Sequence, residues 1–172
     1  MYKVSGKEVL KLLESLPQSD IGAPLPVVMA TEDQVCIAYF TQMHDPTWDG
    51  TFVQLMSYES RATIAILEFK ASHAHQLWPL NECAIGRHPL AKVGLTPFAA
   101  FEVLNSLWTA EFTTKWSDSG YYGQNPKRHF ILTFHHSVFE CVALDVAVLG
   151  TFTGDMNEAA DRMKKHLFAT TT

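Results

Sequence analysis

The clearest alternation of apolar and polar positions runs through residues 129–144. Because strand side chains point alternately to opposite faces, this pattern predicts a β-hairpin. A two-residue turn at 136–137 would place Thr133 opposite Glu140. Both residues would lie on a face that mixes polar and apolar side chains. The His-Ser pair lacks the glycine or asparagine that such turns favour, so a longer loop stays open. In this register one face is wholly apolar and consists of Phe130, Leu132, Phe134, Phe139, Cys141 and Ala143.

Shorter apolar runs predict four further strands. Residues 27–30 and 35–41 are separated by an acidic turn, and residues 52–57 and 62–69 form a second hairpin about Glu59-Ser60 with one apolar face. Residues 71–96 show no periodicity. We expect an ordered irregular loop there, which is the kind of long connection that often carries function.

Three segments carry helix signals. A capping box at Ser5–Glu8 precedes apolar residues at helical spacing and predicts a helix over 5–16. Thr96-Pro97 begins a second helix over 97–113, and Gly154-Asp155 begins a last one that ends at Phe168.

The resulting order is αββββαββα. Hairpins favour antiparallel pairing, so we predict a single α+β domain over residues 1–172. It would contain a largely antiparallel sheet of about six strands with three helices. The mixed face of each hairpin would be exposed or would meet a partner or a ligand.

Composition and charge limit the classes of partner that the protein could bind. The net charge is −5, and the 13 Lys and Arg residues are scattered, which disfavours nucleic acid. No apolar run is long enough to span a membrane, and the amino-terminal residues do not resemble a signal peptide. Three cysteines without a CxxC pair fit reduced thiols in the cytoplasm. Charged residues are only 18% of the chain, so part of the surface is expected to be covered in a homodimer.

Metal binding is the first chemistry to consider. His73-Ala-His75 has the spacing of two ligands on an extended chain. There is no HExxH motif and no second spaced histidine pair, so we expect no metal and no cofactor, with His73 and His75 as the candidates if one binds. The residues that could complete such a site are Cys83, His88, His135, His136 and Glu140.

Acid–base catalysis is the second. The predicted hairpin places Thr133 opposite Glu140 with His135 diagonal to both, and His88 lies in the long loop. These four residues are the catalytic candidates. The alternative is a cross-strand hydrogen-bonding set on a half-exposed sheet face.

Aromatic residues outside the periodic faces predict a contact surface. Aromatics in loops are enriched at interfaces and ligand pockets, although they can also pack over the ends of a core. The binding candidates are Trp78, His88, Trp116, Tyr121 and Tyr122.

Four segments together resemble a small uncharacterised bacterial protein family. They are 86–90 with its His-Pro-Leu loop, 94–95, 105–108, and the Phe-His-x-Ser-x-Phe-Glu-Cys hairpin of 134–141. The resemblance covers about the second half of the chain and implies no activity. His136 stands where an acidic residue is expected, which puts a shared His–carboxylate site in doubt.

The leading interpretation is therefore a cytoplasmic, non-enzymatic binding or protein-interaction domain. Its contact surface would use the 71–95 loop, the 116–128 loop and the polar face of the last hairpin. A small metal-assisted hydrolase-like enzyme is the first alternative and requires His88 to lie within a few ångströms of Glu140. A small-ligand carrier with a pocket between sheet and helices is the second and requires an apolar cavity.

Overall fold

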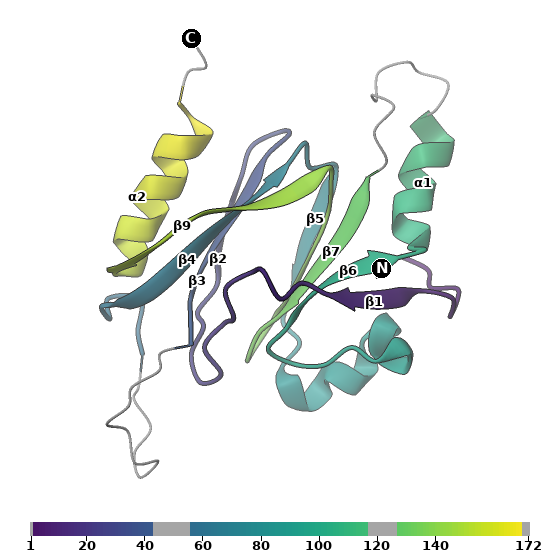
Figure 1. The fold of residues 1–172 in the computed structure, drawn as a ribbon, viewed down its shortest axis with the longest axis horizontal. Helices are drawn as coiled ribbons and strands as arrows, with labels where there is room; N and C mark the ends of the chain where they lie inside the picture. Colours follow the sequence, from purple (N-terminus) through teal and green to yellow (C-terminus); the bar gives the residue numbers. More distant parts are fainter. Residues whose placement is uncertain (1, 43–55, 117–126, 170–172) are drawn as a thin grey trace.

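The computed structural model describes residues 2–42, 56–116 and 127–169, and of residues 113–116 it describes the helix but not the side chains. The chain forms two antiparallel sheets, rather than the one sheet that we expected. It is a mixed α+β protein, as predicted. The two sheets and their flanking helices are seen in Figure 1.

The larger sheet has five strands in the order β1-β6-β7-β8-β5. These strands are β1 (Val9–Leu12), β5 (Ala74–Trp78), β6 (Ala100–Leu104), β7 (Arg128–Thr133) and β8 (Val138–Ala143). The smaller sheet has four strands in the order β2-β3-β4-β9. They are β2 (Val27–Ala30), β3 (Val35–Phe40), β4 (Ala62–Lys70) and β9 (Asp145–Gly154).

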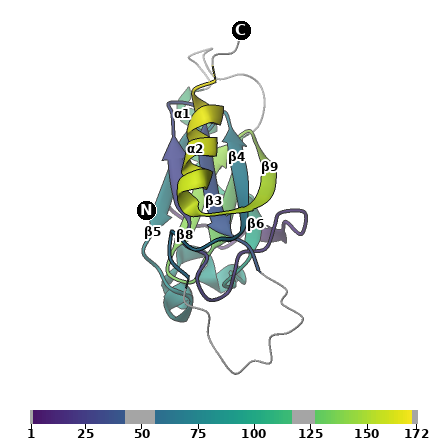
Figure 2. The ribbon, with the colours of Figure 1, turned by 90° about the vertical axis from the view of Figure 1, so that its left-hand side faces the viewer.

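Helices cover the outer sides of both sheets. Helix α2 (Met156–Leu167) lies on the smaller sheet, and α1 (Leu107–Trp116) lies beside the larger one (Figure 1). Two 3₁₀ helices, η1 (Glu82–Arg87) and η2 (Pro89–Val93), pack over the larger sheet together with the amino-terminal residues. Figure 2 shows α2 in front of the smaller sheet. The order of layers is therefore helix, sheet, sheet, and helices.

Three apolar clusters hold these layers together. The central one lies between the sheets and includes Tyr39, Leu67, Phe69 and the apolar face of the 128–143 hairpin. A second joins α2 to the smaller sheet, and a third joins the 3₁₀ helices to the larger sheet. Both faces of β3 and β8 are therefore buried, which explains why those strands are apolar nearly throughout.

The last hairpin forms with the predicted faces but a shifted register. Thr133 pairs with Val138, and Ile131 rather than Thr133 faces Glu140. The connection is four residues long instead of two, consistent with the poor turn chemistry of His-Ser. A shift of two residues keeps every side chain on its face, so all six predicted apolar positions lie in the central core.

The first predicted helix is wrong, because residues 9–12 form a strand. Half of the capping box does form: the Ser5 backbone N–H donates to Glu8 Oε1 at 2.7 Å. Gly6, however, adopts a left-handed backbone with φ +79°, which ends any helix there. Residues 9–12 then pair with β6.

The second predicted helix is wrong in its first half. Phe98 and Asn105 have φ values of +55° and +58°, and these left-handed residues bracket β6. Helix α1 begins only at Leu107. Phe101 and Val103 are two residues apart and buried on one face, so the period of the core positions is that of a strand.

The predicted strands at 27–30 and 35–41 are confirmed, as is the last helix, with Asp155 as its N-cap. The predicted strand at 62–69 is also confirmed, as β4, but its predicted pairing with 52–57 is not, because both edges of β4 are occupied by β3 and β9. Residues 52–55 themselves lie outside the described residues. Strands β5 and β9 lie in segments where we expected none.

Candidate functional site

A buried carboxylate network lies between the larger sheet and the 3₁₀ helices. Glu140 on β8 accepts four hydrogen bonds there. His88 Nε2 and Gln76 Nε2 reach its Oε1 at 3.3 and 2.7 Å. His129 Nε2 lies 3.0 Å from Oε2, which also accepts from the Tyr2 hydroxyl. The convergence of His88 on Glu140 that the enzyme interpretation requires is therefore present.

The second ring nitrogen of each histidine also has a partner. The Leu90 backbone N–H donates to His88 Nδ1 at 3.2 Å, so Nε2 carries the hydrogen that faces Glu140. His129 Nδ1 lies 2.9 Å from the Ser106 hydroxyl, which can donate to it. His88 and His129 thus reach the two oxygens of one buried carboxylate.

The electrostatics of Glu140 follow from this arrangement. Burial alone raises the pKa of a carboxyl group. The hydrogen bonds from His129 and His88, the electrostatic attraction of His129 and the hydrogen bond from Tyr2 together outweigh burial and lower the pKa of Glu140 to about 2. Burial and the neighbouring carboxylate in turn raise the pKa of Tyr2, which keeps its hydroxyl as a donor.

Aromatic rings close the network from outside. Tyr2 stacks on Trp108 with ring centroids 5.0 Å apart, and both rings meet the edge or face of His129. Trp78 covers His88 at 5.3 Å. The side chains of His88, His129 and Glu140 are 0% exposed. Described side chains of the protein itself enclose this carboxylate, so the geometry fits a structural role.

A cavity opens at one end of the two sheets. Its volume is about 440 Å³, which is within the range of small-molecule sites. Its walls come from the segment after β1, from Tyr39 on β3, from the segment that enters β6, and from the end of β7. The apolar lining includes Leu13, Leu16, Phe98 and Phe134.

The polar groups of the cavity divide into two kinds. Tyr39 and Thr133 are engaged: the Tyr39 hydroxyl donates to the Pro17 carbonyl at 2.6 Å, and the Thr133 hydroxyl donates to the Thr96 carbonyl at 2.8 Å. Glu14 and Gln18 are exposed on the segment after β1. The interior therefore offers apolar contact, and the exposed lining offers the carboxylate of Glu14, the amide of Gln18 and the hydroxyl of Thr96.

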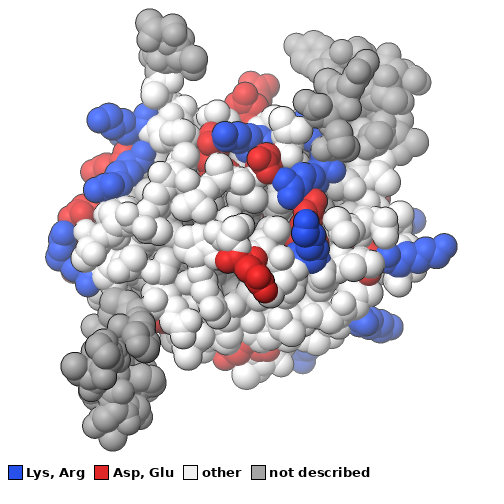
Figure 3. All heavy atoms as spheres, viewed as in Figure 1, with Lys and Arg blue, Asp and Glu red and all other residues white. Residues whose placement is uncertain are grey.

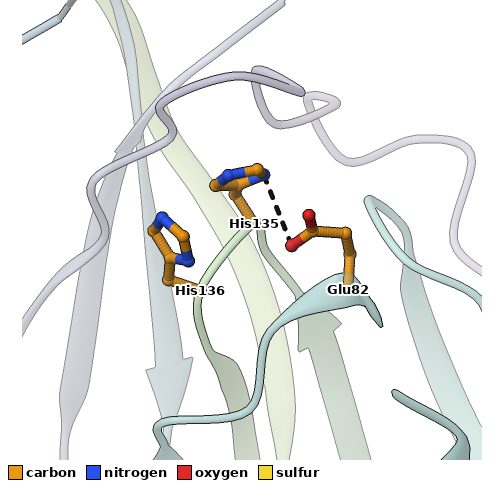
Figure 4. A group of neighbouring side chains, drawn as sticks. All are labelled: Glu82, His135 and His136. Atoms are coloured by element: carbon orange, nitrogen blue, oxygen red, sulfur yellow. Dashed lines mark ion pairs between the residues drawn. The ribbon is translucent and has the colours of Figure 1, made fainter. Parts of the chain in front are cut away.

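A third group lies at the turn between β7 and β8. Glu82, His135 and His136 each offer one ligand atom, and these atoms all lie within 4.8 Å of one another. Figure 4 shows His135 and Glu82 directed toward each other, with the His136 ring beside them. His135 Nδ1 is 3.4 Å from Glu82 Oε2, and these two shielded atoms have no hydrogen-bond partner in the part of the chain that the structure describes. Within the described residues, this is the set whose spacing suits a metal ion.

The metal candidates of the sequence are placed elsewhere. His73 lies before β5 with its ring 6.0 Å from that of Phe112, and His75 is an exposed residue of β5. Partial loss of hydration beside the surrounding protein atoms lowers the pKa of both histidines, and the charge of Lys127 adds to the effect at His73. Neither belongs to the group at the turn.

The catalytic and binding candidates separate in the same way. His88 and Glu140 meet, whereas Thr133 supports the 96–99 segment and His135 lies in the turn. The predicted set of Thr133, His135 and Glu140 therefore does not assemble, because the register shifts by two residues. Trp78 is half-buried. The side chain of Trp116 and the residues Tyr121 and Tyr122 lie outside the described residues.

Sequence reasoning missed Tyr2, Gln76 and Glu82. Tyr2 is 138 positions from Glu140, and Gln76 is 64 positions away, so no local pattern links them. Gln76 could have been found by recognising β5, because it pairs directly with Glu140 in the sheet.

No family model, no curated protein and no solved structure matches this chain. The resemblance to a bacterial family therefore stays a prediction. Within the described part of the chain, the helices are too short or too polar to cross a membrane.

Proposed function

We propose that this protein is a non-enzymatic binding protein that takes up a small, largely apolar molecule in the cavity at the end of the two sheets. The observation that carries the proposal is the cavity of about 440 Å³. It lies between the segment after β1, the segment that enters β6 and the end of β7. It is a concave, partly open pocket with a largely apolar lining, which is the form that small-molecule sites usually take.

The lining indicates the class of ligand. Leu16, Phe98 and Phe134 provide an apolar body, and burial of apolar area is the main source of affinity in such sites. Glu14 is the charged side chain among the lining residues. It disfavours an anionic ligand and favours a neutral or cationic one whose polar end faces the opening.

The hydrolase alternative has less support. A general base must come within hydrogen-bond reach of its substrate, directly or through one water. Glu140 and its two histidines are fully buried, and all four positions around the carboxylate are taken by donors of the protein. The network is better suited to joining β5, β7, β8 and the amino terminus.

The test is titration of the untagged protein with N-phenyl-1-naphthylamine, a neutral apolar dye that fluoresces when it leaves water. We expect saturable binding of one dye per chain. Thr96→Trp, at an exposed lining position, should weaken it about tenfold or more, because the new ring obstructs the opening. Ala100→Leu, deeper in the cavity, should do the same by filling it.

The matched control is Lys92→Trp, which adds an exposed indole on η2 away from the cavity and should leave dye binding unchanged. Circular dichroism verifies that each variant is folded. Non-saturable binding, or equal binding by the wild type, Thr96→Trp and Ala100→Leu, would remove the proposal. Native mass spectrometry of protein from its own host then tests for a retained molecule.

The cytoplasmic location, the homodimer and the lack of nucleic-acid binding remain part of this proposal. The face drawn in Figure 3 mixes basic and acidic side chains, with white uncharged surface between them. Such a mixture gives little attraction to a phosphate backbone.

A further inference from the structure

We infer that Glu82, His135 and His136 form a binding site for a divalent transition-metal ion of the zinc type. The inference is independent of the cavity proposal, because none of these three residues is in the cavity lining. It rests on the chemistry of the three donors, on their spacing, and on two shielded atoms that have no hydrogen-bond partner among the described residues.

The donor set suits zinc. Two imidazoles and one carboxylate are a known zinc ligand combination, and they leave a fourth position of a tetrahedron open. Imidazole also suits copper and nickel ions, whereas magnesium and calcium prefer oxygen ligands alone. An ion of charge +2 would offset the charge of Glu82.

The spacing is that of a tetrahedral edge. Zinc bonds of 2.0–2.2 Å to nitrogen and oxygen place two ligand atoms about 3.4 Å apart. His135 Nδ1 and Glu82 Oε2 are 3.4 Å apart. His136 is exposed, so its ring can rotate to complete the third bond.

The backbone already holds two ligands in place. The Glu82 backbone N–H donates to the His135 carbonyl at 3.1 Å, which fixes the start of η1 to the turn. Asn81 caps η1 by accepting from the Ala84 N–H at 2.9 Å. The ring of Phe98 stacks on His135 with centroids 6.2 Å apart. A site whose ligands are ordered before the ion arrives loses less entropy on binding.

An ordinary ion pair between Glu82 and a protonated His135 is the competing explanation. The chain provides a comparison: His166 Nε2 lies 3.0 Å from Glu68 Oε1, in the geometry of a simple hydrogen-bonded pair. Glu82 Oε2 and His135 Nδ1, in contrast, are 3.4 Å apart and form no hydrogen bond with each other. Both atoms are shielded from solvent. The two atoms face each other as an ion pair without a hydrogen bond between them, which is how two ligands of one ion would be placed.

The experiment is calorimetric titration of untagged, chelator-treated protein with zinc chloride under reducing conditions. We expect one zinc ion per chain. His135→Ala, His136→Ala and Glu82→Gln should each weaken binding by at least about tenfold. His136 is exposed, so its variant is the least able to disturb the fold.

Three controls separate this site from adventitious binding. His166→Ala removes a histidine beside a glutamate, and His75→Ala removes an exposed histidine, so both should bind zinc as the wild type does. Cys83→Ser removes the exposed thiol next to Glu82 and should also retain binding. Zinc binding that the triad variants leave unchanged, or that Cys83→Ser abolishes, would overturn the inference. Thr96→Trp should bind zinc normally, which distinguishes a failure here from a failure of the cavity proposal.

Discussion

Glu140 is a carboxylate that is fully buried in the fold. An isolated carboxylate in a protein interior is unstable because it has lost its hydration. Here donors from four side chains replace that hydration, and the pKa of Glu140 falls to about 2. The charge is therefore tolerated through hydrogen bonds from Tyr2, Gln76, His88 and His129, and it connects segments from both ends of the chain.

Replacing Glu140 by glutamine should destabilise the protein by about 3 kcal/mol at neutral pH, because an amide leaves some of these donors without an acceptor. The pKa of Glu140 lies below the usual 4.5 in the folded state. The unfolded state therefore binds the proton first, and the stabilisation is present above about pH 4.5 and is lost as the pH falls toward 2. The difference between wild type and Glu140→Gln should narrow by about 2 kcal/mol between pH 5 and pH 3. Urea unfolding across this range measures it.

Glu59→Gln is the control, because Glu59 lies on an exposed turn. It should leave both the stability and its pH dependence unchanged within about 0.5 kcal/mol. A stability gap between wild type and Glu140→Gln that stays constant from pH 5 to pH 3 would contradict the depressed pKa of Glu140.

For single residues, the sequence indicates which side chains are unusual, but it does not indicate which distant side chains they contact. A glutamate between Phe139 and Cys141 in a strand is conspicuous, as is a histidine beside a proline, and both were among the candidates. Their meeting at 3.3 Å depends on how η1 and η2 fold back over the larger sheet. Nothing within several residues of Tyr2 indicates that its hydroxyl reaches the same carboxylate.

At the scale of elements, the chain contains the same capping signal twice with different results. Ser5 and Glu8 make their local hydrogen bonds, yet no helix follows. Asp155 accepts from the Glu158 N–H at 2.9 Å, and α2 follows. The difference is the residue after the cap: Gly6 is left-handed, whereas Met156 is buried against the smaller sheet. Capping chemistry is local, and tertiary packing decides whether a helix continues.

Asp155→Ala should lower the stability by about 1 kcal/mol, since the Glu158 N–H at the start of α2 loses its acceptor. Asp155→Asn should retain most of the stability, because an asparagine oxygen can accept the same bond. Denaturant unfolding, monitored by circular dichroism, measures the difference.

Asp161→Ala serves as the control, since Asp161 is an exposed residue in the middle of α2. A loss of stability in Asp161→Ala as large as in Asp155→Ala would show that charge on α2, and not the cap, is responsible.

For the whole molecule, the sequence predicted the class of fold and missed the arrangement of layers. Alternation identified β2, β3, β7 and β8 because each has one continuous apolar face. It could not separate one sheet from two, because that depends on β9 returning to β4 and on β5 adding to β8. Both strands are edge strands with mixed exposure, so neither has the apolar periodicity of a core strand.

The cavity and the Glu82, His135 and His136 group could not be predicted from the sequence for a related reason. Each combines residues from segments that are far apart along the chain, such as Leu16 with Phe134, and Glu82 with His135. Pairing at the ends of strands brings them together. Only His135 and His136, which are adjacent in the turn, could be seen as neighbours in advance.

The layered arrangement predicts which strands exchange their amide hydrogens first. Every residue of β3 and β8 is buried, and these strands lie inside their sheets, so their amide hydrogens should exchange only when the whole chain unfolds. Strands β1 and β9 lie at sheet edges and are largely exposed, and their amides should exchange sooner. Hydrogen exchange followed by mass spectrometry on peptides covering 35–40, 138–143, 9–12 and 145–154 measures this order. Equal protection of 145–154 and 138–143 would contradict it and would mean that another chain covers the β9 edge, as the predicted homodimer could.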